Sequence, residues 1–465
     1  MRSLTLREIA AIVGGDVFGD GDILISGVST DTRAICVGDL FAAIVGERVD
    51  AHDLAPQAVS AGAVAVLGTR RVIEPCIVIP ETSELDAVII ALGKLAAHER
   101  SGLTDVNIIG VTGSSGKTST KDIIGQVLAH QGLTEAPAGS PNNELGMPLT
   151  LLHAPTATKN YVLEMGMRGL GHIAYLCAIA RPTIGVVTNV GLAHVSEVGS
   201  IEKIAIAKAE LVTGLPSNGY AILNADDFRV AAMANVTPAQ VLTYGRAVAS
   251  DLRVSNVVIH GDGTSHFDLT YQSESVSVQL PLLGEHNVSN SAAAAAVGIA
   301  VGMSLADVGA ALTNVTARSK WRMEVSQLSR GITLINDAYN ANPDSMRAAF
   351  STLKAYSPRT TWAIIAGMHE LGAESEREHS ALGQLAFDCD IDRLVIVGEL
   401  ARPALETAVN AGVQAVWFPE FEQASDYIGK QVAADNVLLF KASRSEGLER
   451  LAALVTEQIE RGVQQ

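Results

Sequence analysis

The stretch Ile108-Ile109-Gly110-Val111-Thr112-Gly113-Ser114-Ser115-Gly116-Lys117-Thr118 joins an apolar run to a loop of small residues that ends in a lysine and a threonine. We expect residues 108–112 to form a buried strand, because β-branched residues dominate this run and it is apolar on both faces. Helix-forming sequence follows from residue 119 to about residue 130. A strand, a glycine-containing loop and a helix in this order are the elements of a phosphate-binding loop.

The chemistry of this loop favours a phosphate ligand. Small residues let backbone N–H groups close around phosphate oxygens, and the helix N-terminus adds a positive dipole. Lys117 adds a point charge, and the hydroxyl of Thr118 can ligate Mg²⁺. The loop has two residues, not the four of the standard pattern, before Gly116-Lys117, and an ordinary strand–helix turn is the alternative. The predicted nucleotide contacts are Gly113, Ser114, Ser115, Gly116, Lys117, Thr118 and Ser119.

The rest of the chain predicts an α/β protein. Short β-branched runs alternate with Ala-rich helical stretches, a pattern typical of βαβ units with mostly parallel sheets. The length of 465 residues suggests about three domains. Polar segments at 99–107 and 314–322 precede new strand runs, so we place the domains at residues 1–103, 104–315 and 316–465. Alternating apolar and polar residues between 250 and 281 predict a small antiparallel β insertion in the middle domain.

Composition excludes several classes of protein. Apolar residues make up 48% and charged residues 18%, which excludes a disordered chain. The net charge of −17 opposes binding to nucleic acid or to an anionic membrane. The four cysteines form no CxxC, and the first residues lack the apolar segment of a signal peptide. The longest apolar run, residues 292–303, is shorter than the about 20 residues of a membrane span. We therefore expect a cytoplasmic protein.

Two side chains that follow apolar strands are candidate Mg²⁺ ligands. Glu164 ends the run Tyr161-Val162-Leu163, and His194 comes shortly after another strand. Ligands of α/β proteins bind at the carboxyl ends of parallel strands, and Mg²⁺ prefers oxygen ligands. A lone histidine is more often structural, so this hypothesis depends on both residues lying downstream of a phosphate loop. Lys208 lies in an otherwise apolar helix, where its pattern is that of an ordinary surface lysine.

Five segments together resemble the Mur ligases of peptidoglycan synthesis, over essentially the whole chain. Residues 112–118 have the TGxxGKT form of this family, and residues 337–343, Asp-Ala-Tyr-Asn-Ala-Asn-Pro, have its DxYNANP form. The other three segments are 29–33 with 46–53, 140–146 (Ser-Pro-Asn-Asn-Glu-Leu-Gly) and 286–290 (His-Asn-Val-Ser-Asn). The DxYNANP form is the most specific marker, because it distinguishes the members that add a terminal dipeptide.

The resemblance implies ligand contacts for individual residues. Asn287 and Asn290 match the family's adenine-contacting HNxxN, with a helix N-cap as the structural alternative. Arg322 and Asp337 match residues that the C-terminal domain brings to ATP. The implied substrate-binding residues are Ser29, Thr30, Asp31, Arg33, Asp50, His52, Asn142, Asn143, Tyr339, Asn340 and Asn342. For the N-terminal members of this set, ordinary turn chemistry around a surface strand is the alternative.

The resemblance also changes the interpretation of Lys208, which falls on a lysine that CO₂ carbamylates in this family. A carbamate is an anion, so the modified side chain would ligate Mg²⁺. The implied ligands of two Mg²⁺ ions are Thr118, Glu164, His194 and carbamylated Lys208, and the implied catalytic groups are Lys117, Lys208, His194 and Glu164.

The reaction implied by the family is amide-bond formation driven by ATP. The terminal carboxylate of UDP-N-acetylmuramoyl-tripeptide would attack the γ-phosphoryl group, and the amine of D-alanyl-D-alanine would then displace phosphate. The implied fold has a UDP-sugar-binding domain, a P-loop ATPase domain and a Rossmann-like C-terminal domain, in a monomer. The alternatives are a related Mur-type or folylpolyglutamate-type ligase with another acceptor, and a non-catalytic P-loop nucleotide switch. The N-terminal segment through about residue 98 argues against the folylpolyglutamate type, and Glu164, His194 and Lys208 argue against the switch.

The chain departs from the family pattern at four positions: Ala209 and Ala442 each replace a glycine, Gly367 replaces an aspartate, and Ser196 replaces a glutamate that often follows the metal histidine. The two halves of the predicted ATP site lie in different domains, since Lys117 precedes the second boundary and Arg322 follows it. We therefore expect a hinge at residues 314–322 and an open structure, in which Arg322 and Asp337 lie too far from Lys117 to share a nucleotide.

Overall fold

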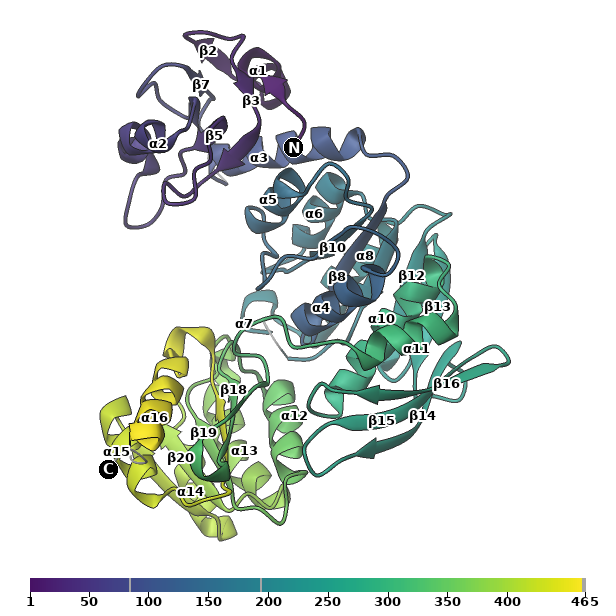
Figure 1. Ribbon diagram of the computed structural model, residues 1–465, viewed down its shortest axis with the longest axis vertical. Helices are drawn as coiled ribbons and strands as arrows, with labels where there is room; N and C mark the ends of the chain where they lie inside the picture. The colour runs from purple at the N-terminus through teal and green to yellow at the C-terminus, as the bar shows by residue number, and fades with distance from the viewer. Residues whose placement is uncertain (83–84, 193–194, 462–465) are drawn as a thin grey trace.

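The structure, a computed structural model, describes residues 1–82, 85–192 and 195–461. Three large sheets follow one another along the chain, and Figure 1 shows them as three bodies, with the N-terminal one at the top and the C-terminal one at the lower left. The N-terminal part contains β1 (Leu4–Thr5), α1 (Leu6–Val13), β2 (Asp16–Phe18), β3 (Leu24–Ile25), β4 (Gly27–Ser29), β5 (Asp39–Ala42), the 3₁₀ helix η1 (Ala51–Leu54), α2 (Ala55–Ala61), β6 (Ala65–Gly68), β7 (Cys76–Val78) and α3 (Ala87–Ser101).

The N-terminal sheet has five strands in the order β2-β7-β6-β5-β4, and a separate antiparallel pair joins β1 to β3. Only β2 runs antiparallel to its neighbour in the five-stranded sheet. The long helix α3 leads out of this part and packs against helices of the middle part (Figure 1). Its buried face includes Leu92 and Leu95, which belong to the same apolar core as residues of the middle part.

The middle part is built on a nine-stranded sheet. Its strands are β8 (Asn107–Thr112), β9 (Thr134–Glu135), β10 (Asn160–Glu164), β11 (Ile184–Val187), β12 (Tyr220–Asn224), β13 (Gln240–Gly245), β14 (Leu252–Ile259), β15 (Ser265–Tyr271) and β16 (Glu274–Leu280). Its helices are α4 (Lys117–Leu128), α5 (Gly146–His153), α6 (His172–Ala180), α7 (Val195–Val198), α8 (Ile201–Thr213), α9 (Phe228–Ala231), η2 (Ala232–Asn235), α10 (His286–Ala300) and α11 (Leu305–Thr313).

The order of the middle strands is β16-β15-β14-β13-β12-β11-β8-β10-β9. The pairs from β9 to β14 are parallel, and the two pairs that involve β15 are antiparallel. The predicted antiparallel segment is therefore present. It is not a separate unit, however, because β14 pairs with β13 at Leu252 and Arg253 and so extends the main sheet.

The C-terminal part has a six-stranded sheet in the order β17-β18-β22-β19-β20-β21, parallel except for β17. Its elements are β17 (Glu324–Gln327), η3 (Ser329–Gly331), β18 (Thr333–Asp337), α12 (Pro343–Lys354), β19 (Thr361–Ile365), η4 (Gly372–Glu374), α13 (Ser375–Asp388), β20 (Arg393–Val397), α14 (Ala404–Ala411), β21 (Gln414–Phe418), α15 (Phe421–Gln431), β22 (Val437–Lys441), η5 (Arg444–Glu446) and α16 (Glu449–Arg461). The predicted α/β class with mostly parallel sheets is confirmed.

Strand β8 lies at the point where the strand order of the middle sheet reverses. The chain leaves β8 towards β9 and β10 on one side and continues with β11 on the other. Ile108, Ile109 and Val111 are completely buried, as expected for a central parallel strand. Ligands of open α/β sheets bind at such switch points, beyond the carboxyl ends of the strands. The sheet therefore carries the loop after β8 to its natural ligand-binding edge.

The Ala-rich helix α10 packs closely on α4, the helix that follows this loop. Residues 292–296 are five consecutive alanines that are fully buried, in one apolar core with Ile123, Ile124 and Val127 of α4. Small side chains let two helix backbones approach each other. Packing of α10 on α4 therefore fixes the position of the helix whose first turn would face a phosphate.

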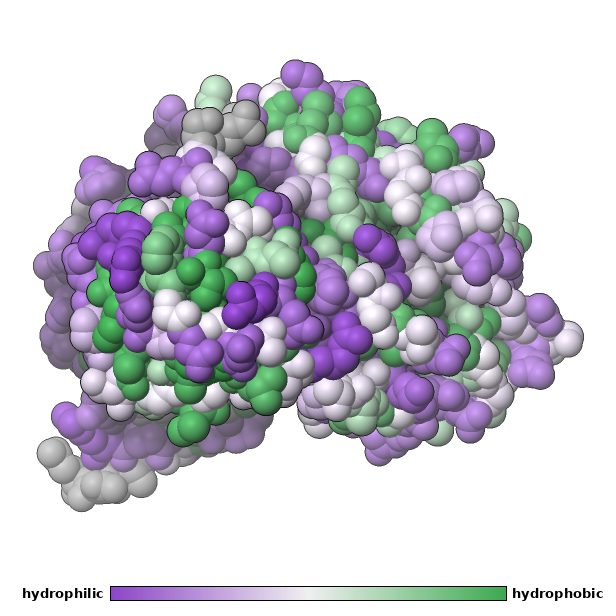
Figure 2. Space-filling view, turned by 90° about the horizontal axis from the view of Figure 1, so that it is seen from above, coloured by the Kyte–Doolittle hydropathy of each residue, from purple (hydrophilic) through white to green (hydrophobic). Residues whose placement is uncertain are grey.

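The surface is mixed, and Figure 2 shows hydrophilic side chains between smaller groups of hydrophobic ones on one face. None of the helices in the described part of the chain has both the length and the apolar character needed to cross a membrane.

We expect Ala294→Leu to destabilise the protein, because the larger side chain would have to fit between α10 and its neighbours. Overpacking of a well-packed core costs about 1–3 kcal/mol. The matched control is Ala310→Leu, since Ala310 is an exposed alanine of the adjoining helix α11. The midpoint of urea unfolding, followed by circular dichroism, should fall for the first variant and stay unchanged for the second. Equal midpoints for both variants would contradict this account of the packing.

Candidate functional site

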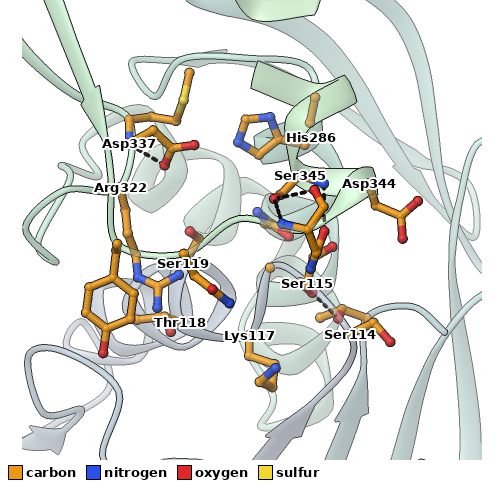
Figure 3. A pocket seen from close by; sticks show the side chains of 18 of the residues that line it. Ser114, Ser115, Lys117, Thr118, Ser119, His286, Arg322, Asp337, Asp344 and Ser345 are labelled. Carbon is orange, nitrogen blue, oxygen red and sulfur yellow. Dashed lines mark hydrogen bonds between the residues drawn. The ribbon is translucent and has the colours of Figure 1, made fainter. Parts of the chain in front are cut away.

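A cavity of about 380 Å³ lies between the carboxyl edge of the middle sheet and the first segments of the C-terminal part. Figure 3 shows the loop before α4 on one side of it and the start of α12 on the other. Residues predicted as site residues that line the cavity are Ser114, Ser115, Gly116, Lys117, Thr118, Ser119, Asn142, Glu164, Asn287, Asn290, Arg322, Asp337, Tyr339, Asn340 and Asn342. The sequence therefore identified residues from several distant segments that the fold brings together.

The backbone of the phosphate loop has positive φ values at both of its glycines. Gly116 has a φ of 77°, in the left-handed region, and α4 begins directly after it at Lys117, two residues earlier than predicted. Gly113 has a φ of 153° and approaches β11 so closely that a Cβ there would lie 1.8 Å from Thr188 Oγ1. The N-terminal turn of α4 consequently faces the cavity with its backbone N–H groups, as an anion site requires.

Two residues at the end of β11 hold the loop in place. Asn189 accepts a hydrogen bond from the backbone N–H of Ser115 at 2.9 Å, and its amide donates to the Ser115 hydroxyl at 3.1 Å. Thr188 Oγ1 donates to the Ser115 carbonyl at 2.7 Å. Both residues line the cavity, and sequence reasoning did not assign them to the site. Their position directly after an apolar strand, at the same sheet edge as β8, was the signal that could have found them.

Lys117 lies beside the loop with its charge partly desolvated. Its Nζ donates to the carbonyl of Gly113 at 2.8 Å. Burial lowers the pKa of Lys117 below its usual value, and the charge of Glu164 acts in the opposite direction. A bound anion would stabilise the ammonium group of a lysine held this close to the loop.

Glu164, at the end of β10, collects three hydrogen bonds at the base of the cavity. Thr118 Oγ1 donates to Oε2 at 2.7 Å, and Oε1 accepts from Ser140 Oγ at 2.6 Å and from the Asn142 amide at 2.8 Å. Burial of this carboxylate acts to raise its pKa, but the charges of Lys117 and Arg322, together with these hydrogen bonds, lower the pKa overall. Glu164 is therefore a buried anion next to the hydroxyl of Thr118.

The other predicted metal ligands do not complete a cluster among the described residues. His194 lies outside the described part of the chain. Lys208 is buried on α8 and is not among the residues that line the cavity. Burial, and then the like charge of Lys117, hold the pKa of Lys208 well below its usual value. Within residues 1–82, 85–192 and 195–461 no group of three His, Cys, Asp or Glu side chains has the arrangement of a metal site.

The first turn of α10 supplies amides to the cavity. Asn287 donates to the carbonyl of Leu283 at 2.8 Å, and Asn290 donates to Asn287 at 2.9 Å and accepts from Thr120 at 3.1 Å. Neither asparagine is the N-cap, which is Glu285, so the structural alternative for these residues is wrong. His286 also lines the cavity, and burial lowers its pKa below the usual value.

The C-terminal part adds a cation and an ion pair. The Arg322 guanidinium lies 4.1 Å from the centre of the Tyr339 ring, and its buried Nε has no hydrogen-bond partner among the described residues. Asp337 accepts from Lys441 Nζ at 2.5 Å and from the backbone N–H of Met323 at 3.1 Å. Lys441, which is buried, also donates to the carbonyl of Asn340 at 3.0 Å. Arg322 therefore has donor capacity free to meet an anion in the cavity.

The start of α12 forms the opposite wall. Asn342 is the N-cap of α12 and accepts from the backbone N–H of Ser345, whose hydroxyl accepts from the N–H of Asn342 in return. Asp344 approaches the middle part closely, since a Cβ at Gly191 would lie 2.1 Å from its Oδ2. Asp344 and Ser345 line the cavity and were not predicted. The Asn-x-x-Ser spacing of a capping box, followed by an apolar helix face, was the available signal.

The N-terminal residues of the predicted substrate site lie elsewhere, and none of them lines this cavity. Asp31 accepts both the backbone N–H and the guanidinium of Arg33, which holds the pKa of Asp31 at about 2. His52 is buried, pairs with Asp50 at 2.6 Å and accepts from the backbone N–H of Thr69 at 2.9 Å. These bonds are local, and contact with a substrate stays a prediction. Ser29, Thr30, Asn143 and Gly113 are also absent from the lining of the cavity.

The expected open arrangement is wrong for this structure. Arg322 and Asp337 line the same cavity as Lys117, and the charge of Arg322 acts on both Lys117 and Glu164. The sequence could not predict this, because the relative position of two domains depends on tertiary contacts such as that of Asp344 with Gly191.

Comparison with known proteins was consistent with this site. Three family models match the chain: "Mur ligase family, catalytic domain" at residues 24–98, "Mur ligase middle domain" at 111–298 and "Mur ligase, glutamate ligase domain" at 321–444. The chain is 41% identical to a UDP-N-acetylmuramoyl-tripeptide–D-alanyl-D-alanine ligase of Mycobacterium tuberculosis, with 98% of each chain covered. It is 36% identical to the enzyme of the same name from Escherichia coli, with 98% of this chain and 99% of that one covered.

Solved structures agree with the sequence relatives. A crystal structure of MurF from Acinetobacter baumannii is 30% identical, covers 98% of this chain and 99% of its own, and superposes with a TM-score of 0.88. A MurF ligase from Thermotoga maritima in complex with ADP is 26% identical, covers 94% of this chain and 98% of its own, and has a TM-score of 0.80. The loop after β8, the carboxylate at the end of β10 and the sequence relatives lead to one conclusion, that this chain belongs to the Mur ligase family.

Proposed function

We propose that this protein is an ATP-dependent ligase that joins D-alanyl-D-alanine to UDP-N-acetylmuramoyl-tripeptide in the synthesis of peptidoglycan precursors. The observation that carries this proposal is the cavity in which the phosphate loop faces residues 337–342 of the C-terminal part. A ligase of this type must hold ATP and a peptide carboxylate at one place. Relatives that cover 98% of the chain carry the name of this activity.

The first chemical step would be attack of the tripeptide carboxylate on the γ-phosphoryl group of ATP, which gives an acyl phosphate and ADP. Two anions must approach each other, so the site has to supply positive charge. The backbone N–H groups at the start of α4 would bind phosphate oxygens, and Lys117 and Arg322 would supply the charges on either side. The unpartnered Nε of Arg322 and the position of Lys117 Nζ beside the loop, at 2.8 Å from the carbonyl of Gly113, support this assignment.

The second step would be attack of the dipeptide amine on the acyl carbonyl, which forms the amide bond and releases phosphate. The acyl phosphate must be protected from water until the amine arrives. The wall formed by Tyr339, Asn340 and Asn342 supports such a role, because it lines the same cavity as the phosphate loop. We assign these three residues, with Asn142, to the positioning of the peptide substrates.

The residues present fit a Mg²⁺ site next to the phosphate loop. The hydroxyl of Thr118 and the buried, ionised carboxylate of Glu164 lie 2.7 Å apart, and both are hard oxygen donors. Mg²⁺ bound there would neutralise the charge of the phosphate oxygens. We propose Thr118, Glu164, His194 and carbamylated Lys208 as ligands of two ions.

The structure supports carbamylation of Lys208 through its environment. Reaction with CO₂ needs a neutral amine, and it converts Lys–NH₂ and CO₂ into Lys–NH–COO⁻ and a proton. Burial on α8 and the like charge of Lys117 keep the pKa of Lys208 well below its usual value, which favours the neutral amine. The product would place a carboxylate where an ammonium ion is disfavoured.

Four further assignments are proposals of the same kind. We place the UDP-sugar in the N-terminal part, near Ser29, Thr30, Asp31, Arg33, Asp50 and His52, and the peptide chain towards the cavity. We divide the chain into domains at 1–103, 104–315 and 316–465, a division supported by the three separate sheets. We also propose that the protein works as a monomer and in the cytoplasm.

Phosphate release should need ATP, Mg²⁺, UDP-N-acetylmuramoyl-tripeptide and D-alanyl-D-alanine together, because the acyl phosphate forms only when the carboxylate is present and turns over only with the amine. The measurement is a coupled phosphate-release assay in which each component is omitted in turn. Equal rates with a single amino acid in place of the dipeptide, or with glutamate and folate, would refute the proposed function.

Lys117→Ala should lose almost all activity and keep its fold, because the loop backbone stays while the charge at the β- and γ-phosphates is lost. Removal of one such contact costs on the order of 3 kcal/mol in the transition state, roughly a hundredfold in rate. The matched control is Lys203→Ala, which removes an exposed lysine of α8. Steady-state rates and melting temperatures of both variants provide the test, and near-normal turnover of Lys117→Ala would mean that the lysine is not needed for catalysis.

Lys208 should carry a carbamate in the active enzyme. Protein equilibrated with ¹³C-bicarbonate should show a carbamate resonance by ¹³C NMR that is absent from Lys208→Ala. This variant should be nearly inactive, and short carboxylic acids should partly restore its turnover by filling the space of the lost group. An active wild-type enzyme without the resonance would contradict the assignment.

A further inference from the structure

The segment between α11 and β17 is held to the middle part at two buried positions. Residues 313–320 are exposed except for Val315, which is 1% exposed, and Ser319, which is 5% exposed. Val315 packs into the apolar core that contains α4 and α10. Ser319 is polar, so its burial beside α4 requires hydrogen-bond partners.

Those partners form a buried polar cluster around Asp122. Ser319 Oγ donates to Asp122 Oδ2 at 2.6 Å and accepts from the backbone N–H of Gly139 at 3.3 Å. Lys121 Nζ donates to Asp122 Oδ1 at 2.5 Å and also to the carbonyl of Pro137. Lys121 is completely buried and Asp122 is 6% exposed. Because a desolvated ion pair is costly unless all its bonds are made, this cluster strongly favours one geometry.

Three members of this cluster lie close in sequence to residues of the proposed active site. Asp122 lies four residues after Thr118 on the same helix, one turn further along. Gly139 precedes Ser140, whose hydroxyl binds Glu164. Ser319 lies three residues before Arg322, the cation that the C-terminal part contributes to the cavity.

A second contact fixes the segment one turn further along α4. The Gln126 side chain accepts from the backbone N–H of Thr316 at 2.9 Å and donates to its carbonyl at 3.0 Å. The backbone changes character directly after Ser319, since Trp321 and Met323 have φ values of 58° and 50°. Non-glycine residues in this left-handed region are uncommon and concentrate at functional sites. The predicted hinge at residues 314–322 therefore contains Val315, Thr316 and Ser319, which are anchored on the middle part, and the left-handed residues follow directly after them.

We propose that Asp122 and Ser319 position Arg322. Their hydrogen bond fixes the segment between α11 and β17 on α4, so that the guanidinium reaches the phosphate loop in one defined arrangement. Neither side chain needs to touch the substrate. The kinetic test of this proposal rests on the proposed ligase function. Asp122 and Ser319 lie outside the residues assigned above to the phosphates, the metal ions and the peptide substrates.

The first test is Ser319→Ala in the full-length protein. Loss of the hydroxyl should lower kcat by roughly 10- to 100-fold, the scale of misplacing a catalytic group by about 1 Å. The KM for ATP should change less than threefold, because the phosphate loop is untouched. Ser319→Thr keeps the hydroxyl and should recover most of kcat.

A matched control removes a similar bond far from the cavity. Thr361 Oγ1 donates to Asp392 at 3.0 Å and accepts from the backbone N–H of Asp392 at 3.2 Å, so it repeats the hydroxyl–carboxylate pairing of Ser319. Thr361→Val should lower the melting temperature about as much as Ser319→Ala and leave kcat unchanged. A fall of kcat in both variants would mean that the effect of Ser319 is one of general stability, and would overturn the proposal.

The decisive measurement is a double-mutant cycle with Arg322→Ala. If Ser319 acts by placing the guanidinium, the variant with both changes should have the kcat of Arg322→Ala alone, within about twofold. Effects that multiply, or an unchanged kcat of Ser319→Ala, would refute the positioning role. A wild-type enzyme without dipeptide-dependent phosphate release would instead refute the proposed function, so the two failures are distinguishable.

Discussion

The phosphate loop is confined between β11 and α10 so tightly that neither of its two glycines could carry a side chain. A Cβ at Gly113 would lie 1.8 Å from Thr188 Oγ1, and one at Gly116 would lie 2.6 Å from Asn290 Oδ1. This close approach lets Thr188 and Asn189 bind the backbone of Ser115, and it brings the amides of α10 to the first turn of α4. The direction of the exposed N–H groups, and with it the place of any phosphate, follows from that contact.

In this acidic protein, the positive charge that could bind a phosphate ligand is found locally, in the cavity. The net charge of −17 acts at long range against polyanions, whereas the cavity is lined by the cations Lys117, Arg322 and Lys441 and by three carboxylates, those of Glu164, Asp337 and Asp344. Glu164 stays ionised although it is buried, because two cations and three hydrogen bonds outweigh its desolvation. Asp337 is held by Lys441, so the positive charge of Arg322 is left for a ligand. A site with spare donors and a neutralised carboxylate suits a phosphate ester better than a cationic ligand.

The sequence predicted those parts of the site that depend on local chemistry. Lys117 and Thr118 could be predicted from the loop motif. Glu164 could be predicted from its position at a strand end, because an apolar run shows where a strand ends. Asn189 and Asp344 were missed, since one acts by holding backbone and the other by a contact between segments more than 150 residues apart. The α/β class was predictable from alternating segments, whereas the extension of the middle sheet by β14 depends on a pairing that the alternation of β14–β16 does not reveal. The open arrangement was wrong for the same reason, because domain contacts leave no periodic pattern in a sequence.

The cavity draws its charges from two parts of the chain, so its geometry depends on the segment that joins them. This segment is fixed on α4 at Val315, Thr316 and Ser319, and the left-handed residues Trp321 and Met323 follow immediately. Because the fixed part ends only three residues before Arg322, the anchor on α4 restricts where the guanidinium can lie relative to the phosphate loop. The short distance along the chain between Ser319 and Arg322 thus allows one segment both to connect the two parts of the chain and to place a cation in the cavity.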